Sequence, residues 1–159
     1  NMAALWRVPI LYLVENNLYA VGTSTRESSF VEDLALRAIG YGIESLIVDG
    51  MDPIAPYLAL RTIVPTMRRQ PRPFLLEAKT YRLVHHAGSL PGSAFGYRSK
   101  EEEAFWKARD PLTAFPQRLR EAGLVVAERR GTWAYYKATE LGRAALHALS
   151  HLALEPATR

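Results

Sequence analysis

Cysteine is absent from this chain of 159 residues, which excludes disulfide bonds and thiolate metal sites. Long hydrophobic runs are absent as well, because no apolar stretch approaches the roughly 20 residues that a membrane-spanning helix needs. The early apolar run 8–14 lacks the basic leader and small-residue cleavage site of a signal peptide. The sequence therefore predicts a soluble, cytoplasmic protein with no membrane partner.

Net charge is small, with 20 basic and 16 acidic side chains giving +4. Residues 1–115 hold 13 basic and 12 acidic side chains, whereas residues 116–159 hold 7 and 4. The tail thus carries +3 of the excess and favours a polyanionic partner. With 48% hydrophobic residues, the chain can bury a core and still carry a small appendage.

Continuous apolar runs alternate with helical patterns over the first half of the chain. They predict strands at 8–14, 44–48 and 74–78, a helix at about 30–39 that ends at Gly40-Tyr41-Gly42, and a helix at 53–69. Strands that are continuous apolar runs and alternate with helices indicate a parallel sheet covered by helices on both faces. The expected fold class is α/β, with a mostly parallel sheet and flanking helices.

The second half begins with a loop over 82–99, since it holds three glycines and no sustained periodicity. Ser99 and Glu102 match a capping box that starts a helix. Pro111 starts another helix, which Pro116 should break or bend.

The organisation then changes. Two short strand patterns flank Arg129-Arg130-Gly131 and predict a hairpin, and Thr139 caps a final helix to about residue 152. We therefore expect two domains, 1–124 and 125–159.

A polar cluster follows the first apolar run, where Glu15-Asn16-Asn17 precedes Leu18 and Tyr19. Ligands of open α/β sheets bind outside the carboxyl ends of the strands. Carboxamide and carbonyl oxygens at that place suit magnesium carrying substrate phosphates. The alternative is a polar turn, because asparagine is a common turn former.

Several motifs occur in a consistent order along residues 1–124. They are Asn1-Met2-Ala3-Ala4-Leu5-Trp6, Glu15-Asn16-Asn17 with Tyr19, Val48-Asp49-Gly50-Met51-Asp52, Glu77-Ala78-Lys79-Thr80-Tyr81-Arg82, His85-His86, Tyr97-Arg98 and Arg109-Asp110-Pro111. Together they resemble the carboxyl-terminal half of the alpha subunit of thiamine-diphosphate-dependent 2-oxo acid dehydrogenases, of the pyruvate and branched-chain type. Gly40-Tyr41-Gly42-Ile43, and Arg82 followed by His85-His86, favour the branched-chain relatives.

This resemblance implies a thiamine-diphosphate-binding fold in which Mg2+ holds the cofactor diphosphate. It implies that Asn17 supplies a side-chain oxygen to the metal and Tyr19 its backbone carbonyl. It makes His86 the catalytic histidine, which also contacts the cofactor, and Arg82 a cofactor-binding residue that steadies the loop or the diphosphate.

The implied reaction is oxidative decarboxylation of a 2-oxo acid, with acyl transfer to a lipoyl carrier. The implied partners are a beta-type subunit, in a heterotetramer, and a lipoyl-bearing acyltransferase. The family's Gly-Asp-Gly motif, which carries the anionic metal ligand, would precede Asn1, and Ala87 replaces the regulatory serine of mammalian relatives. We expect the chain to be inactive alone.

Residues 119–152 resemble the end of the recognition helix and the wing of arsenic-repressor-type winged helices. This resemblance implies that Arg129, Arg130 and Lys137 contact the phosphate backbone of nucleic acid. An amphipathic hairpin and helix packed on the sheet is an equal alternative. The chain as a whole is then an alpha-subunit segment, a DNA-associated winged-helix fragment, or a non-functional fusion remnant.

Overall fold

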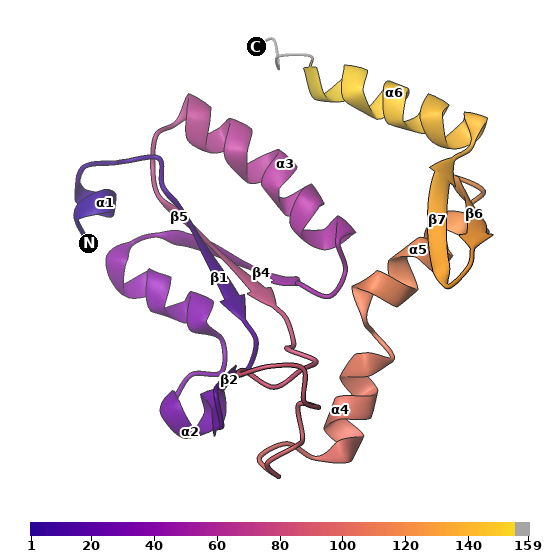
Figure 1. Ribbon diagram of the computed structural model, residues 1–159. Helices are drawn as coiled ribbons and strands as arrows, with labels where there is room; N and C mark the ends of the chain where they lie inside the picture. The colour runs from indigo at the N-terminus through magenta and orange to yellow at the C-terminus, as the bar shows by residue number, and fades with distance from the viewer. Residues whose placement is uncertain (155–159) are drawn as a thin grey trace. The chain divides into compact units, whose positions relative to one another are not determined.

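The computed structural model describes the backbone of residues 1–154 and the side chains of residues 1–149. Contacts divide the chain into two compact units, Asn1–Asp110 and the part from Pro111 onward (Figure 1). The sequence places the domain boundary at residue 124 instead. The contacts group α5 (Pro111–Glu121) with the hairpin that follows it, and α5 packs against the first hairpin strand.

The first unit is built on a three-stranded parallel sheet in the order β1-β5-β4 (Figure 1). The strands are β1 (Leu11–Asn16), β4 (Glu44–Asp49) and β5 (Phe74–Lys79). The parallel sheet predicted from the apolar runs is confirmed. The predicted bounds 8–14 of the first strand are wrong: Pro9 has no N–H to donate to a ladder, whereas Glu15 and Asn16 still pair with β5.

Helices lie on both faces of this sheet. The helix α3 (Ile54–Arg69) buries Ile63 and Met67 against Leu76 of the central strand. On the other face lies η1 (Leu34–Tyr41), a 3-10 helix that buries Ala35 and Ala38. Such a helix has three residues per turn, so alanines three apart fall on one face.

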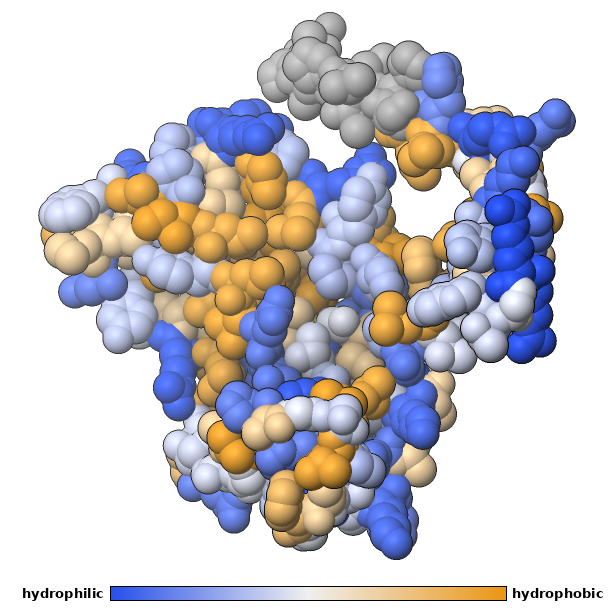
Figure 2. Space-filling model, viewed as in Figure 1, coloured by the Kyte–Doolittle hydropathy of each residue, from blue (hydrophilic) through white to orange (hydrophobic). Residues whose placement is uncertain are grey.

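The start of the predicted helix over 30–39 is wrong, because the segment becomes helical only after Asp33. Its predicted end at Gly40-Tyr41-Gly42 is confirmed, since the helix ends at Tyr41 and Gly42 follows it with a φ of 66°. The cover over the edge strand β1 is incomplete, since Tyr12 is 40% and Leu13 52% exposed. Figure 2 shows hydrophobic side chains gathered on the visible face of the sheet unit.

Short elements fill the connection that follows β1. They are β2 (Tyr19–Ala20), β3 (Thr23–Ser24) and α2 (Thr25–Ser28), and α1 (Met2–Leu5) lies at the start of the chain. The two short strands form an antiparallel pair. This pair folds the chain back immediately beyond the carboxyl end of β1.

The long connection after β5 leads to α4 (Lys100–Lys107). Between them Val84 and Pro91 form an isolated bridge. Ser99 caps α4 as predicted, its hydroxyl accepting from the Glu102 N–H at 3.0 Å. The reciprocal half of the predicted capping box is wrong, because the Glu102 carboxylate accepts from the Tyr19 hydroxyl instead.

The second unit contains α5, an antiparallel hairpin and α6 (Glu140–Leu154). The hairpin strands are β6 (Val125–Arg130) and β7 (Trp133–Ala138). The hairpin is as predicted, and so is the Thr139 cap, whose hydroxyl accepts from the Gly142 N–H at 3.0 Å. A break at Pro116 is wrong: α5 continues to Glu121, since an internal proline removes one helical hydrogen bond but can be accommodated.

Within the described part of the chain, no helix combines the length and the apolar character needed to cross a membrane.

Candidate functional site at the carboxyl end of the sheet

A tight turn over residues 16–19 begins where β1 ends. The Oδ1 atom of Asn16 accepts from the Leu18 N–H, and Oδ1 of Asn17 accepts from the Tyr19 N–H, both at 3.1 Å. Leu18 adopts a φ of 70°, a left-handed backbone conformation that residues other than glycine rarely take. Asn16 and Asn17 therefore form the turn that the alternative interpretation expected, and that turn places two consecutive asparagines at the end of a strand.

This turn is compatible with cation binding. A carboxamide oxygen has two lone pairs, so Asn17 Oδ1 retains an acceptor position after receiving the Tyr19 N–H. The backbone strain at Leu18 is a property that proteins concentrate at functional sites. The turn is therefore observed, and the role of Asn17 as a metal ligand stays a prediction.

Tyr19 lies against a pocket beside the turn. Its hydroxyl donates to both carboxylate oxygens of Glu102 at 3.0 Å. Burial and this contact raise the pKa of the phenol to about 12, so Tyr19 is neutral at physiological pH.

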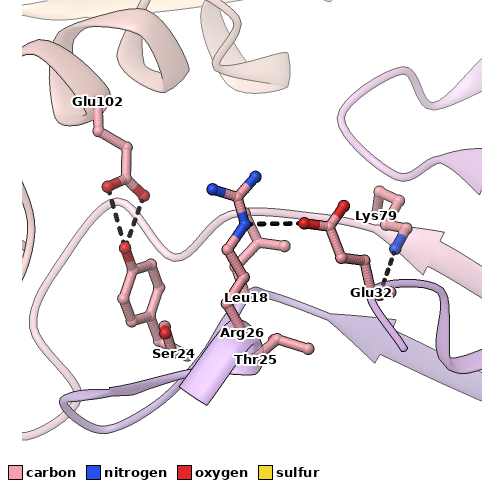
Figure 3. Close-up of a pocket in the computed structure, with 8 residues that line it drawn as sticks. Leu18, Ser24, Thr25, Arg26, Glu32, Lys79 and Glu102 are labelled. Carbon is pink, nitrogen blue, oxygen red and sulfur yellow. Dashed lines mark hydrogen bonds and ion pairs between the residues drawn. The ribbon is translucent and has the colours of Figure 1, made fainter. Parts of the chain in front are cut away.

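The pocket has a volume of about 450 Å³ (Figure 3). Arg26 and Glu32 pair in it at 2.9 Å, and Lys79 donates to the Glu32 carbonyl at 3.1 Å. Its cations are therefore matched by acidic and carbonyl oxygens. The residues that line it are Leu18, Tyr19, Ser24, Thr25, Arg26, Glu32, Lys79 and Glu102.

Arg82 bonds the backbone of the short connection between β2 and β3. Its Nη2 donates to the Val21 carbonyl at 3.3 Å, and its Nε donates to the Val84 carbonyl at 3.2 Å. Val21 itself has a φ of 57°, a genuine outlier for a β-branched residue. Arg82 is therefore tied to the backbone two residues beyond Tyr19, and among the described residues no hydrogen bond joins it to Asn17 or to Tyr19.

His86 lies on the loop that leaves β5 and is exposed. Among the described residues, no hydrogen bond or ring contact joins it to the 16–19 turn. Its neighbour His85 packs on Phe95, with ring centroids 4.7 Å apart, and accepts from the Ala87 N–H through Nδ1. His86 therefore lies on the loop that follows β5, and its catalytic role stays a prediction.

Glu77 is a functional candidate that the sequence reasoning missed. Its side chain is fully buried in the central strand, yet it is satisfied by Asn16 Nδ2 at 2.7 Å, the Ala35 N–H at 2.6 Å and Lys79 Nζ at 2.9 Å. Burial acts to raise the pKa of this carboxyl, and the hydrogen bonds outweigh it and hold the pKa below its ordinary value. The sequence feature that could have identified Glu77 is its position as a single charged residue within the apolar strand predicted at 74–78.

Arg98 is a second missed residue. It is 3% exposed, and its guanidinium lies over the rings of Tyr19, Tyr81 and Tyr97 at 4.5, 4.7 and 5.1 Å. Its Nη1 donates to the Arg82 carbonyl. Arg98 therefore fixes the far end of the loop against the residues that flank the turn, a role that the Tyr97-Arg98 motif did not reveal in the sequence.

The two candidate ligand oxygens beyond the end of β1 carry no negative charge, which limits the kind of metal site that they can form. Asn17 and the Tyr19 carbonyl are neutral donors, and no cluster of three acidic or histidine ligands occurs among the residues described. Neutral oxygens suit Mg2+ when its charge is balanced by phosphate oxygens and a carboxylate. The donor set thus fits a metal–diphosphate unit rather than a metal held by the chain alone.

These features define an α/β protein with a polar site outside the carboxyl ends of parallel strands. Residues 1–156 match the family model described as "Dehydrogenase E1 component". The chain therefore belongs to the dehydrogenase E1 component family. The match continues past residue 124, where the motif-based resemblance ends.

Curated relatives agree with this assignment. The pyruvate dehydrogenase E1 component subunit alpha of Rickettsia bellii is 42% identical over 113 residues, 71% of this chain and 34% of the relative. The same subunit of Rickettsia prowazekii is 39% identical over 140 residues, 88% and 40% of the two chains. The mitochondrial 2-oxoisovalerate dehydrogenase subunit alpha of Mus musculus is 38% identical over 134 residues, 84% and 30%. The chain spans about a third of the length of these relatives.

Proposed function

We propose that this chain is the segment of a 2-oxo acid dehydrogenase alpha subunit that holds thiamine diphosphate through Mg2+. The observation that carries the proposal is the strained 16–19 turn, which lies at the end of β1 and contains Asn17 and Tyr19, with Arg82 bonded to the Val21 carbonyl two residues further on. The family membership and the relatives named as alpha subunits support it.

Each site residue has a role that its chemistry allows. Asn17 Oδ1 and the Tyr19 carbonyl are the Mg2+ ligands, and Arg82 binds the diphosphate through charge-assisted hydrogen bonds. His86 is the catalytic histidine, which donates a hydrogen bond or a proton near the cofactor. When bound, thiamine diphosphate supplies the nucleophilic carbon for oxidative decarboxylation of the 2-oxo acid.

The partners follow from the same assignment. A beta-type subunit completes the cofactor site, and the acyl group passes to a lipoyl-bearing acyltransferase. The substrate is pyruvate or a branched-chain 2-oxo acid, since relatives of both names occur. The chain by itself is inactive, because the anionic metal ligand comes from a Gly-Asp-Gly segment outside it.

Calorimetry of thiamine diphosphate binding, with and without Mg2+, tests this proposal. The chain is titrated alone, with a beta-type subunit, and with both that subunit and the Gly-Asp-Gly segment. We expect Mg2+-dependent binding in the complete mixture and a weakening of at least about tenfold for Asn17→Ala. Asn1→Ala is the matched control, since Asn1 is exposed and its side chain makes no capping hydrogen bond. Absence of binding in every mixture would leave the chain as a remnant.

A second candidate function rests on the hairpin of the second unit. Its β6 and β7 strands bring Arg130, Trp133 and Lys137 to one face, where Trp133 is 72% exposed. Cations beside exposed aromatic rings favour nucleic acid, and the winged-helix resemblance points to the same class. Arg130 is paired with Glu128 at 3.0 Å, which reduces the positive charge of this face.

Filter binding of duplex DNA across a salt series tests the second candidate. We expect affinity that falls steeply with salt and is lost when Arg129, Arg130 and Lys137 are all changed to Gln. The control changes the exposed Arg61, Arg68 and Arg69 of the first unit to Gln, which removes the same charge. Equal loss in both variants, or binding insensitive to salt, contradicts a hairpin site.

A further inference from the structure

We infer that Glu77, acting through Asn16, is the positioning residue that fixes the Asn17–Tyr19 turn in its binding conformation. The inference rests on the proposed function for its meaning, but its geometry is independent of any bound cofactor.

Both the nitrogen and the oxygen of the Asn16 side-chain amide form hydrogen bonds. Nδ2 donates to Glu77 Oε1 at 2.7 Å, and Oδ1 accepts from the Leu18 N–H at 3.1 Å. Asn16 is 5% exposed, so water does not compete readily for either bond. The orientation of the amide, and with it the acceptor that holds Leu18, is therefore set by Glu77.

Glu77 is itself held from three directions. Ala35 N–H anchors Oε2 to η1 at 2.6 Å, while Lys79 and Asn16 share Oε1. Lys79 in turn pairs with Asp33 at 2.9 Å, immediately before η1. Because all these donors lie on regular or anchored backbone, the carboxylate has one well-defined position.

Burial of the Glu77 carboxylate is not explained by a gain in folding stability. Buried ionic groups are often neutral or unfavourable for stability compared with apolar residues of similar size. The neighbouring Leu76 shows that an apolar side chain is readily buried in this strand. The bond to Asn16 supplies the role, since it links the rigid centre of the sheet to the backbone between the two proposed metal ligands.

Leu18 is the point where such a link is needed. Its φ of 70° is unfavourable for a leucine, so the turn relaxes unless it is held. Relaxation would separate Asn17 Oδ1 from the Tyr19 carbonyl. Groups that orient metal ligands from behind change metal affinity by about 10- to 100-fold when they are removed.

Amide hydrogen exchange on the full chain tests the inference without cofactor. We expect Glu77→Gln and Asn16→Leu to accelerate exchange of the Leu18 and Tyr19 amides about tenfold, with β5 amides such as that of Leu76 unchanged. Glu44→Gln is the matched control, a glutamate of the same sheet at the opposite end of its strand. Unchanged exchange at Leu18, or equal acceleration throughout β5, overturns the positioning role.

Calorimetry of thiamine diphosphate with Mg2+ in the complete mixture adds the second readout. Both variants are expected to weaken binding about 10- to 100-fold while Glu44→Gln binds as the unaltered chain does. If the unaltered chain fails to bind, the proposed function fails and the exchange result alone judges the positioning role. If the unaltered chain binds and the variants bind equally well, the positioning role fails and the proposed function stands. If Glu77→Gln does not fold, Asn16→Leu carries both measurements.

Discussion

The Asn16 side-chain amide donates to the Glu77 carboxylate at 2.7 Å, although 61 residues separate the two in the sequence. The bond crosses from the edge strand β1 to the central strand β5, at the end where the strained turn begins. A charged group in the centre of a small sheet thereby becomes part of the support for the candidate site.

Acid should destabilise the chain through Glu77. Burial raises the pKa of this carboxyl, but hydrogen bonds from Asn16, Lys79 and Ala35 lower it below the unfolded value of 4.5. A depressed folded pKa gives stability that is present above pH 4.5 and is lost as pH falls through the folded pKa. Urea unfolding from pH 7 to pH 3 should show this loss, and Glu77→Gln should flatten it. An identical acid limb in both proteins would contradict the prediction.

The Tyr19 phenol should lose its proton at a higher pH than an ordinary tyrosine does. Burial and the Glu102 carboxylate raise its pKa to about 12, so Glu102→Gln should lower that pKa toward the ordinary value of 10. A raised phenol pKa gives stability that is present below pH 10 and lost as pH rises toward 12. Absorbance of phenolate from pH 9 to pH 13, with Tyr19→Phe identifying the transition, checks the shift. Glu101→Gln is the control on the same helix turn, and an unshifted Tyr19 transition in Glu102→Gln would refute the assignment.

Gly50, just after β4, should not tolerate a side chain. A Cβ there would meet Thr80 Cγ2 and would lie 2.9 Å from the Lys79 carbonyl, which already accepts from the Gly50 N–H. Gly50→Ala should therefore cost about 1–3 kcal/mol of unfolding free energy. Gly40→Ala is the control, since nothing lies within 4 Å of its Cβ and it should be neutral or stabilising. Chemical denaturation compares them, and equal stabilities would show that the close approach is relieved.

Arg98 should contribute more to stability than Arg109. Arg98 is buried over three tyrosine rings and bonds the Arg82 carbonyl, so Arg98→Ala, which leaves a cavity among those rings, should cost about 2–4 kcal/mol. Arg109 also lies over two rings, but its side chain is 46% exposed, and Arg109→Ala should cost below about 1 kcal/mol. Thermal and urea unfolding of both variants measure the difference. A cost for Arg109 that equals or exceeds that for Arg98 would contradict the argument.

Much of the fold was predictable because its signals are local. The three strands, α3 and the hairpin follow from apolar runs and turn residues, and Ser99 and Thr139 cap the helices that they were expected to cap. The errors arose where proline or tertiary contacts intervene. Pro9 delays the start of β1, and the predicted helix over 30–39 begins only at Leu34, as a 3-10 helix that buries Ala35 and Ala38.

The candidate site divides in the same way. The Asn17 and Tyr19 positions, Arg82 and His86 were found because they belong to contiguous motifs, and their roles in metal and cofactor binding stay predictions. Local patterns in the sequence were enough to locate the strands, the family motifs and the oxygens at the end of β1. The contacts that support these oxygens depend on the three-dimensional fold, because Glu77 meets Asn16, and Arg98 meets Tyr19, only after parallel pairing and loop closure bring distant segments together. The energy of such contacts depends on burial and direction, which residue type and spacing do not specify.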